Sequence, residues 1–180
     1  MSWDALKLAK FEAMQPPNIR LFRDRAKAKR KENRAFFKRL KKNPPKDLDR
    51  TVHQLDEEAF SQIDCLDCAN CCKTTSPVFK KRDIERLAKP FNIRPATFVE
   101  RYLRRDEDDE YVLQQAPCPF LGDDNYCSVY EDRPAACASF PHTHRRKFHQ
   151  LLSVTEKNTT VCPAVFHIVE RMKEIYSKGW

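Results

Sequence analysis

Four cysteines lie within eight residues of this 180-residue chain, at Cys65, Cys68, Cys71 and Cys72. Thiolates are the ligands that structural zinc and iron–sulfur clusters prefer, and a two-residue gap lets neighbouring thiolates reach one centre. The first three positions also match the start of the ligand run in bacterial ferredoxins. The segment therefore predicts metal binding.

The other four cysteines, Cys118, Cys127, Cys137 and Cys162, stand apart from one another in the second half of the chain. Cys118 and Cys162 are each followed by proline, as the last cluster ligand of ferredoxins often is. Eight thiols in a reducing compartment are most economically assigned to one or two centres with four thiolates each.

Other uses of these cysteines fit the sequence less well. The chain has no segment typical of a signal peptide and no run of about 18 apolar residues, so we expect a cytoplasmic protein without membrane contact, in which disulfides are disfavoured. Inert buried cysteines would not cluster so densely, and thioredoxin-like exchange would need a βαβ unit around the motif. With two glycines in the whole chain, glycine-rich phosphate loops and Rossmann-type cofactor sites are also disfavoured.

Further residues accompany the cysteines in a recognisable order. They form the motifs Cys65-x2-Cys68-x2-Cys71-Cys72, Asp83-Ile84, Cys118-Pro-Phe-Leu121, Tyr126-Cys127-Ser-Val-Tyr130, Arg133-Pro134, Cys137, Phe140-Pro141 and Cys162. Over roughly residues 60–166 this pattern resembles the YkgJ-like CxxCxxCC family, which is described as zinc- or iron-chelating and includes a relative of the flagellin lysine methylase. The resemblance implies that all eight cysteines are metal ligands.

The residues leave the metal open. We favour zinc, because structural zinc sites commonly have four thiolate ligands. The alternative is a 4Fe–4S cluster, which the ferredoxin-like spacing and the methylase relative favour. One centre of each kind would also use eight thiols. The expected function is non-enzymatic metal binding, with no catalytic residue identified. The alternative is a redox or protein-modifying enzyme, related to lysine methylation, whose iron–sulfur cluster takes part in the chemistry.

The net charge of +8 is concentrated in residues 20–50, which hold fourteen Lys or Arg against four Asp or Glu. From Asn18 to Lys42 no proline or glycine interrupts the chain, which predicts a long helix that packs on the body at its ends and stops at Asn43-Pro44-Pro45. Residues 20–50 are a candidate contact for RNA, the ribosome or an acidic protein, unless their charges merely face water.

Aromatic residues interrupt the basic segment. Phe22, Phe36 and Phe37 lie between its lysines and arginines, an arrangement that predicts stacking on unpaired bases.

Short elements must position the cysteines of the second part. At the start of the chain, the residues from Trp3 to Phe11 are predicted to form an amphipathic turn. Hydrophobic spacing, proline positions and turn residues predict four helices, two strands and a hairpin-like turn. The helices cover residues 56–63, 80–89, 95–105 and 163–178, the strands 111–115 and 151–155, and the turn 121–126.

Three features near the cysteines bear on their chemistry. Pro134 should start a short helix that aims Cys137 inward, while Arg133 and Lys73 should lower thiolate pKa values. His142 and His144 either add a ligand or a proton shuttle, or belong to a polar loop, which we favour.

The expected architecture is an α-rich, small α+β protein. A basic N-terminal helical arm, residues 1–55, precedes a metal-stapled cysteine-cluster domain, residues 56–180. Because structural zinc contributes on the order of 10–16 kcal/mol, against a typical net domain stability of about 5–15 kcal/mol, we expect metal to decide whether the cysteine domain folds.

Overall fold

The computed structural model of the protein describes residues 18–177, which form a helix-rich structure with one two-stranded sheet, as the sequence predicts. The predicted turn at Trp3 to Phe11 lies outside the described residues. The elements in chain order are α1 (Ile19–Lys42), α2 (Leu48–Phe60), α3 (Cys65–Cys68), α4 (Asn70–Thr74), α5 (Lys81–Ala88), α6 (Pro95–Tyr102), β1 (Leu103–Arg105), β2 (Tyr111–Leu113), α7 (Ala135–Ala138), the 3-10 helix η2 (Phe148–Leu151), α8 (Leu152–Asn158) and α9 (Pro163–Tyr176).

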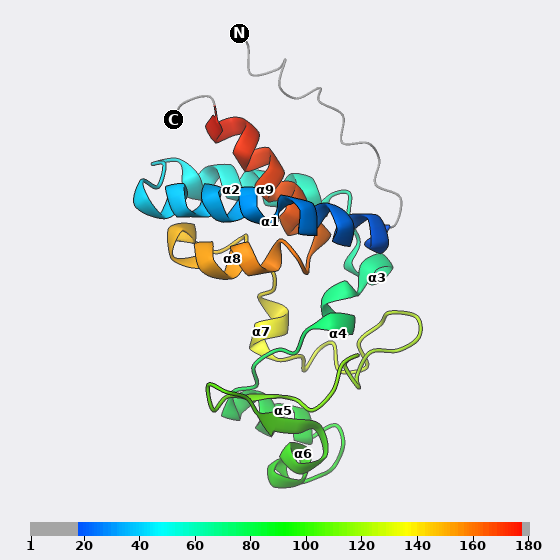
Figure 1. Cartoon of the computed structure of the whole chain (residues 1–180). Coiled ribbons are helices and arrows are strands. Elements are labelled where there is room, and N and C mark those ends of the chain that lie inside the picture. Colours follow the sequence, from blue (N-terminus) through cyan, green and yellow to red (C-terminus); the bar gives the residue numbers. More distant parts are fainter. Residues whose placement is uncertain (1–17, 178–180) are drawn as a thin grey trace.

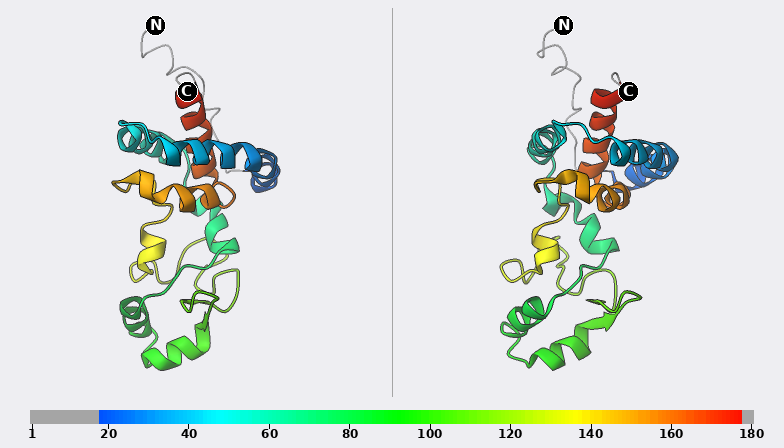
Figure 2. Two further views of the ribbon diagram at one scale, coloured as in Figure 1. Left: turned by 60° about the vertical axis from the view of Figure 1, so that its left-hand side comes forward. Right: turned by 90° about the vertical axis from the view of Figure 1, so that its left-hand side faces the viewer.

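These elements pack in two groups, with the cysteine-bearing segments between them. Helices α1, α2, α8 and α9 form one group, and α5, α6 and the β1–β2 hairpin form the other (Figure 1). Figure 2 shows in two further views that α3, α4 and α7 lie between the groups. Each group has a hydrophobic core of its own.

The first core joins the beginning of the described chain to its end. Phe37 and Leu40 of α1 and Val52 of α2 meet the apolar face of α9, on which Val165 and Met172 are fully buried. The spacing of the apolar residues in α9 predicts this face correctly, and Pro163 occupies the favoured first turn of the helix.

Helix α1 has the expected limits. The side chain of Asn18 accepts a hydrogen bond from the backbone N–H of Leu21 at 3.0 Å and caps the helix. Its buried apolar residues are near its ends, as predicted. Phe22, Phe36 and Phe37 are among these buried residues, so the prediction that they stack on unpaired bases is wrong. Their apolar area is used in packing against the rest of the helical group.

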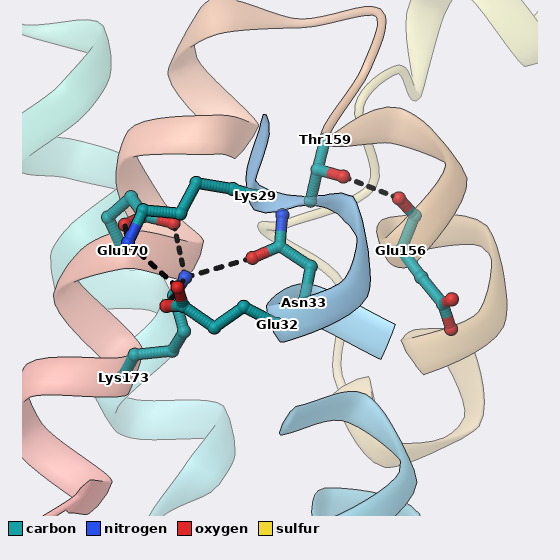
Figure 3. A network of polar contacts seen from close by, with 7 residues as sticks. All are labelled: Lys29, Glu32, Asn33, Glu156, Thr159, Glu170 and Lys173. Carbon is teal, nitrogen blue, oxygen red and sulfur yellow. Dashed lines mark hydrogen bonds and ion pairs between the residues drawn. The ribbon is translucent and has the colours of Figure 1, made fainter. Parts of the chain in front are cut away.

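A polar network fixes the middle of α1 against α9 (Figure 3). The Lys173 side chain is 12% exposed, and its ammonium donates to the side-chain oxygen of Asn33 at 2.9 Å and pairs with the carboxylates of Glu32 and Glu170. Hydrogen bonds from Lys173 and Lys29 hold the pKa of Glu32 below its ordinary value.

The second core packs α5 and α6 against the hairpin and the following loop. Phe98 and Leu113 are buried at its centre, and the Phe98 ring is stacked on Phe120 with centroids 5.9 Å apart. The helix predicted over 95–105 ends at Tyr102, and its last three residues are β1, which pairs antiparallel with β2.

The acidic residues 106–110 form the hairpin turn between β1 and β2. The Asp106 carboxylate accepts the backbone N–H groups of Asp108 and Glu110 at 3.0 and 2.9 Å, so its charge is used to close the turn.

The strand predicted over 151–155 is wrong, because these residues belong to η2 and α8. The buried positions Leu152, Thr155 and Asn158 recur every three residues, which is the spacing of one helix face and not of a strand. The Thr155 hydroxyl donates to the carbonyl of Leu151 at 2.9 Å, as Thr does within a helix. No helix among residues 18–177 combines the length and the apolar character needed to cross a bilayer.

The network around Lys173 gives a test of how firmly α1 is held. Lys173→Met removes the cation that Glu32 and Glu170 share, and we expect unfolding to become easier by about 1–2 kcal/mol, since water screens the half-exposed Glu32. Lys38→Met, at an exposed position of α1 without an ion pair among the described residues, should change stability by less than about 0.5 kcal/mol. Denaturant unfolding of both variants checks this, and equal stability would contradict the structural role of Lys173.

Candidate metal centre

The eight cysteines lie in or beside the layer between the two groups of elements. Cys65, Cys68, Cys71 and Cys72 are on α3 and α4, and Cys137 is on α7. The rest flank these segments: Cys118 and Cys127 belong to the loop after β2, and Cys162 is the N-cap residue of α9. All eight are free thiols; Cys65 is exposed and the other seven are partly buried.

The dense cysteine segment folds as two very short helices joined by a sharp bend. The Asp64 carboxylate caps α3 by accepting the backbone N–H of Leu66 at 2.8 Å. The helix stops at Ala69, which has a left-handed conformation with φ of 45°, and α4 starts at the next residue. The bend prevents one continuous helix and directs successive thiols toward different neighbours.

Asn70 ties this bend to the two ends of the helical group. Its side-chain N–H donates to the carbonyl of Val161 at 2.7 Å, and its side-chain oxygen accepts from the Arg23 guanidinium at 3.1 Å. Val161 precedes Cys162, so the bond brings Cys162 to the α3–α4 segment although about 90 residues separate them in the chain. Asn70 is 3% exposed and thus uses its amide as a buried connector.

The loop after β2 is tied to the same segment from the other side. The backbone N–H of Cys118 donates to the carbonyl of Cys72 at 2.9 Å. The Asn125 side chain donates to the carbonyl of Leu66 at 2.6 Å, and a β-bridge between Leu121 and Cys127 closes the predicted hairpin-like turn. Cys118 and Cys127 therefore lie beside Cys72.

Asp83 positions the segment that carries Cys137. This carboxylate, almost fully buried on α5, accepts the backbone N–H groups of Lys80 at 3.0 Å and Ala135 at 3.1 Å, and pairs with Arg86 at 2.8 Å. Ala135 is the first residue of α7, and Pro134 precedes it as predicted. Arg86 also donates to the carbonyls of residues 132 and 133, so one ion pair joins α5 to the start of α7.

Burial makes most of these thiols hard to ionise in the metal-free chain. Desolvation raises the pKa of Cys118 to about 11 and those of Cys137 and Cys162 to about 12. The pair at the end of the run behaves differently: the Cys71 thiol donates to Cys72 across 3.9 Å, which raises the pKa of Cys71 and lowers that of Cys72 to about 7.

Donors and cations around the sulfurs favour the thiolate form. Lys73 lowers the pKa of Cys68 and Cys72, and Arg133 lowers those of Cys127 and Cys137, as the sequence predicts. Burial outweighs these cations at all four thiols, and the pKa of Cys72 is lowered overall because of its hydrogen bond with Cys71. In four cases a backbone N–H two residues later donates to the sulfur, and this contact also lowers the thiol pKa. These are Asn70 to Cys68, Phe120 to Cys118, Val129 to Cys127 and Ala164 to Cys162.

The thiols influence one another within two sets. The pKa of Cys162 is raised by the thiolates of Cys65 and Cys68, and that of Cys71 by those of Cys65 and Cys162. A second set appears in the same way, because the pKa of Cys137 is raised by the thiolates of Cys72, Cys118 and Cys127. Cys72 also raises the pKa of Cys65 and Cys68 in the first set, and its sulfur contacts that of Cys71. Among residues 18–177, no group of three His, Cys, Asp or Glu side chains lies in position to hold a metal ion.

The histidines belong to a polar loop held by α2. The carboxylate of Asp49 accepts the backbone N–H groups of Lys147 and Phe148 at 2.7 and 2.8 Å, and the hydroxyl of Thr143 donates to Asp56. His144 is exposed within this loop. Burial lowers the pKa of His142.

Several residues that shape the site escape the sequence analysis. Asp83 is noticed as part of a motif, but its bond to α7 depends on tertiary structure. Asn70 and Asn125 are single polar residues among the cysteines, and that position is the one signal the sequence offers for them. Arg23 reads as one more charge of the basic segment, whereas it contacts Asn70.

Comparison with known proteins assigns the family. Residues 64–163 match the CxxCxxCC family, described as a "putative zinc- or iron-chelating domain". The match covers more than half of the chain and includes all eight cysteines, so the chain belongs to this family. Neither the curated proteins nor the solved structures contain a match.

The role of Asp83 can be tested by removal of its carboxylate. Asp83→Ala removes the acceptor of the Ala135 N–H and the carboxylate that pairs with Arg86, so we expect a loss of about 2–4 kcal/mol of stability and faster alkylation of Cys137 in native protein. Asp123→Ala, at an exposed loop position, is the matched control and should leave both measurements unchanged. Denaturant unfolding and site-resolved alkylation provide the comparison; the same behaviour in both variants would contradict the role of Asp83.

Proposed function

We propose that this protein chelates metal in two separate four-thiolate centres. The first consists of Cys65, Cys68, Cys71 and Cys162. The second consists of Cys72, Cys118, Cys127 and Cys137. The observation that carries the proposal is the pair of long-range hydrogen bonds that brings Cys162 to the α3–α4 segment on one side and Cys118 to Cys72 on the other.

The tethers support this division from both sides of the α3–α4 segment. Asn70 bonds to the residue before Cys162, and the backbone of Cys118 bonds to that of Cys72. Cys71 and Cys72 are adjacent on α4, with their sulfurs 3.9 Å apart, and we assign them to different centres, so that α4 would be the common wall of the two. For metal to bind, the cysteine side chains would have to rotate about their Cα–Cβ bonds to bring the four sulfurs of each set together.

We favour zinc in a structural role. Four thiolates around Zn²⁺ carry a net negative charge, and the donors that face the sulfurs, with Lys73 and Arg133, offset it. Metal at these positions would close the layer between the two hydrophobic cores, where the helices are four or five residues long. Helices of that length are not stable by themselves in water.

A second candidate concerns the first centre. Cys65, Cys68 and Cys71 with the remote Cys162-Pro163 reproduce the ligand pattern of a 4Fe–4S cluster in bacterial ferredoxins, and the structure's tether through Asn70 is what brings Cys162 to the run. An iron–sulfur cluster there would make redox chemistry available, with zinc remaining in the second centre.

Metal analysis of anaerobically purified protein tests the function and the division together. We expect two metal equivalents in the native chain and one in each of Cys68→Ser and Cys137→Ser, because each substitution opens one centre. The remaining thiols of the opened centre should become reactive to alkylation while those of the other stay protected. Iron with matching sulfide, and visible absorption that bleaches on reduction and disappears only in Cys68→Ser, would select the cluster for the first centre. A native, folded, metal-free chain with eight titratable thiols would contradict chelation.

The raised thiol pKa values predict a steep pH dependence of metal binding. Thiols that hold their protons at neutral pH must release them to the solvent when metal binds, so affinity falls as pH falls. We expect release of about four protons per metal at the first centre. At the second centre we expect about three above pH 7, because Cys72, with its pKa of about 7, is already ionised there.

Calorimetry in buffers of different ionisation enthalpy counts these protons. The variants Cys68→Ser and Cys137→Ser separate the two centres, since each leaves the other one intact. Release of fewer than about two protons per metal would contradict thiolate ligation, because each bound thiol with a raised pKa must lose its own proton.

A further inference from the structure

The outward face of α1 carries a row of cations that one carboxylate, Asp24, interrupts near its start. Phe22, Phe36 and Leu40 turn inward, and at about 100° per residue the opposite face is occupied by six basic residues. At about 1.5 Å per residue the row is about 33 Å long. We call it the basic row; it consists of Arg20, Lys27, Lys31, Arg34, Lys38 and Lys42.

These charges are not used within the part of the chain that the structure describes. All six side chains are exposed, and none makes a hydrogen bond or an ion pair with residues 18–177. Of the two carboxylates on α1, Glu32 is turned toward Lys173, while Asp24 lies within the row, between Arg20 and Lys27. Other basic residues of the helix do have partners, such as Arg23 on Asn70 and Lys29 on Glu32. As far as residues 18–177 are concerned, the basic row is therefore a concentrated positive surface without internal partners.

The surroundings of the row define the chemistry of its ligand. Leu21 is the one large apolar side chain of α1 that is exposed, because the phenylalanines are buried. An amphipathic membrane helix and a protein interface both need apolar anchors, and single-strand binding needs aromatic platforms for bases. The row offers positive charge without apolar anchors. Its ligand should therefore be a polyanion whose phosphates, like the cations of the row, are held in a rigid line.

We propose that the basic row binds the phosphate backbone of a nucleic-acid duplex, such as a structured RNA, without recognition of base sequence. The 24-residue helix α1, braced on one side by α8 and α9, holds the cations in a straight line. Figure 1 shows α1 in front of α2 and α9. The proposal does not depend on the identity of the metal, since no cysteine lies on α1.

Binding of this kind has a characteristic salt dependence. Each phosphate that is neutralised releases counterions, so contact with about six phosphates gives a slope near −5 in a plot of log K against log salt. Affinity should then fall by about a thousandfold between about 50 and 200 mM salt.

The test compares two variants of equal charge in the full, metal-loaded chain. Lys31→Gln, Arg34→Gln and Lys38→Gln together remove the middle of the row, and we expect at least a tenfold loss of affinity for an RNA duplex at low salt and a slope less steep by about three. The control combines Arg82→Gln, Lys89→Gln and Arg94→Gln, which are exposed around α5 and α6, and should bind within about twofold of the native chain. Metal content and thermal unfolding establish that both variants are folded.

Single-stranded RNA, duplex DNA and polyglutamate complete the set of probes. Equal binding of RNA and DNA duplexes, tighter than that of the single strand, supports backbone contact by shape and charge. The proposal is overturned by preference for the single strand, by binding of polyglutamate alone, by an equal loss in the control variant, or by no binding at low salt.

Discussion

The structure depends on the layer of short helices and loops between its two groups of elements, which has little stability of its own. Between the two hydrophobic cores the chain forms loops and helices of four or five residues, and such helices gain too few hydrogen bonds to offset the entropy of ordering them. All eight cysteines of this CxxCxxCC-family chain lie in or beside this layer. Chelation by these thiols, as we propose, would supply an interaction large enough to unite the two cores.

Polar side chains hold the segments of this layer together. Asn70, Asp83 and Asn125 each bond to backbone groups far away in sequence, and these bonds bring together the segments on which the thiols are carried. A site whose segments are already in place loses less conformational entropy when it binds its ligand. The basic helix shares in this arrangement, because Arg23 of α1 bonds to Asn70.

The sequence predicts those features that depend on neighbouring residues. Metal-ligand spacing identifies the family, the long uninterrupted segment predicts α1, and apolar periodicity predicts α9 with its buried face. The failures arise where distant packing decides. Residues 151–155 have strand-like composition but bury one helix face against α1, and residues 103–105 leave a helix because β2 supplies them with hydrogen-bond partners.

The same limit applies to the site. The spacing identifies eight cysteines as candidate ligands but does not assign them to centres. Cys162, for example, is brought to the α3–α4 segment by a hydrogen bond between Asn70 and Val161. X-ray absorption at the metal edge of the intact protein tests this account most directly. It predicts a first coordination shell of four sulfurs and no nitrogen or oxygen, at about 2.3 Å if the metal is zinc. A shell that contains nitrogen or oxygen ligands, or fewer than four sulfurs per zinc, would contradict it.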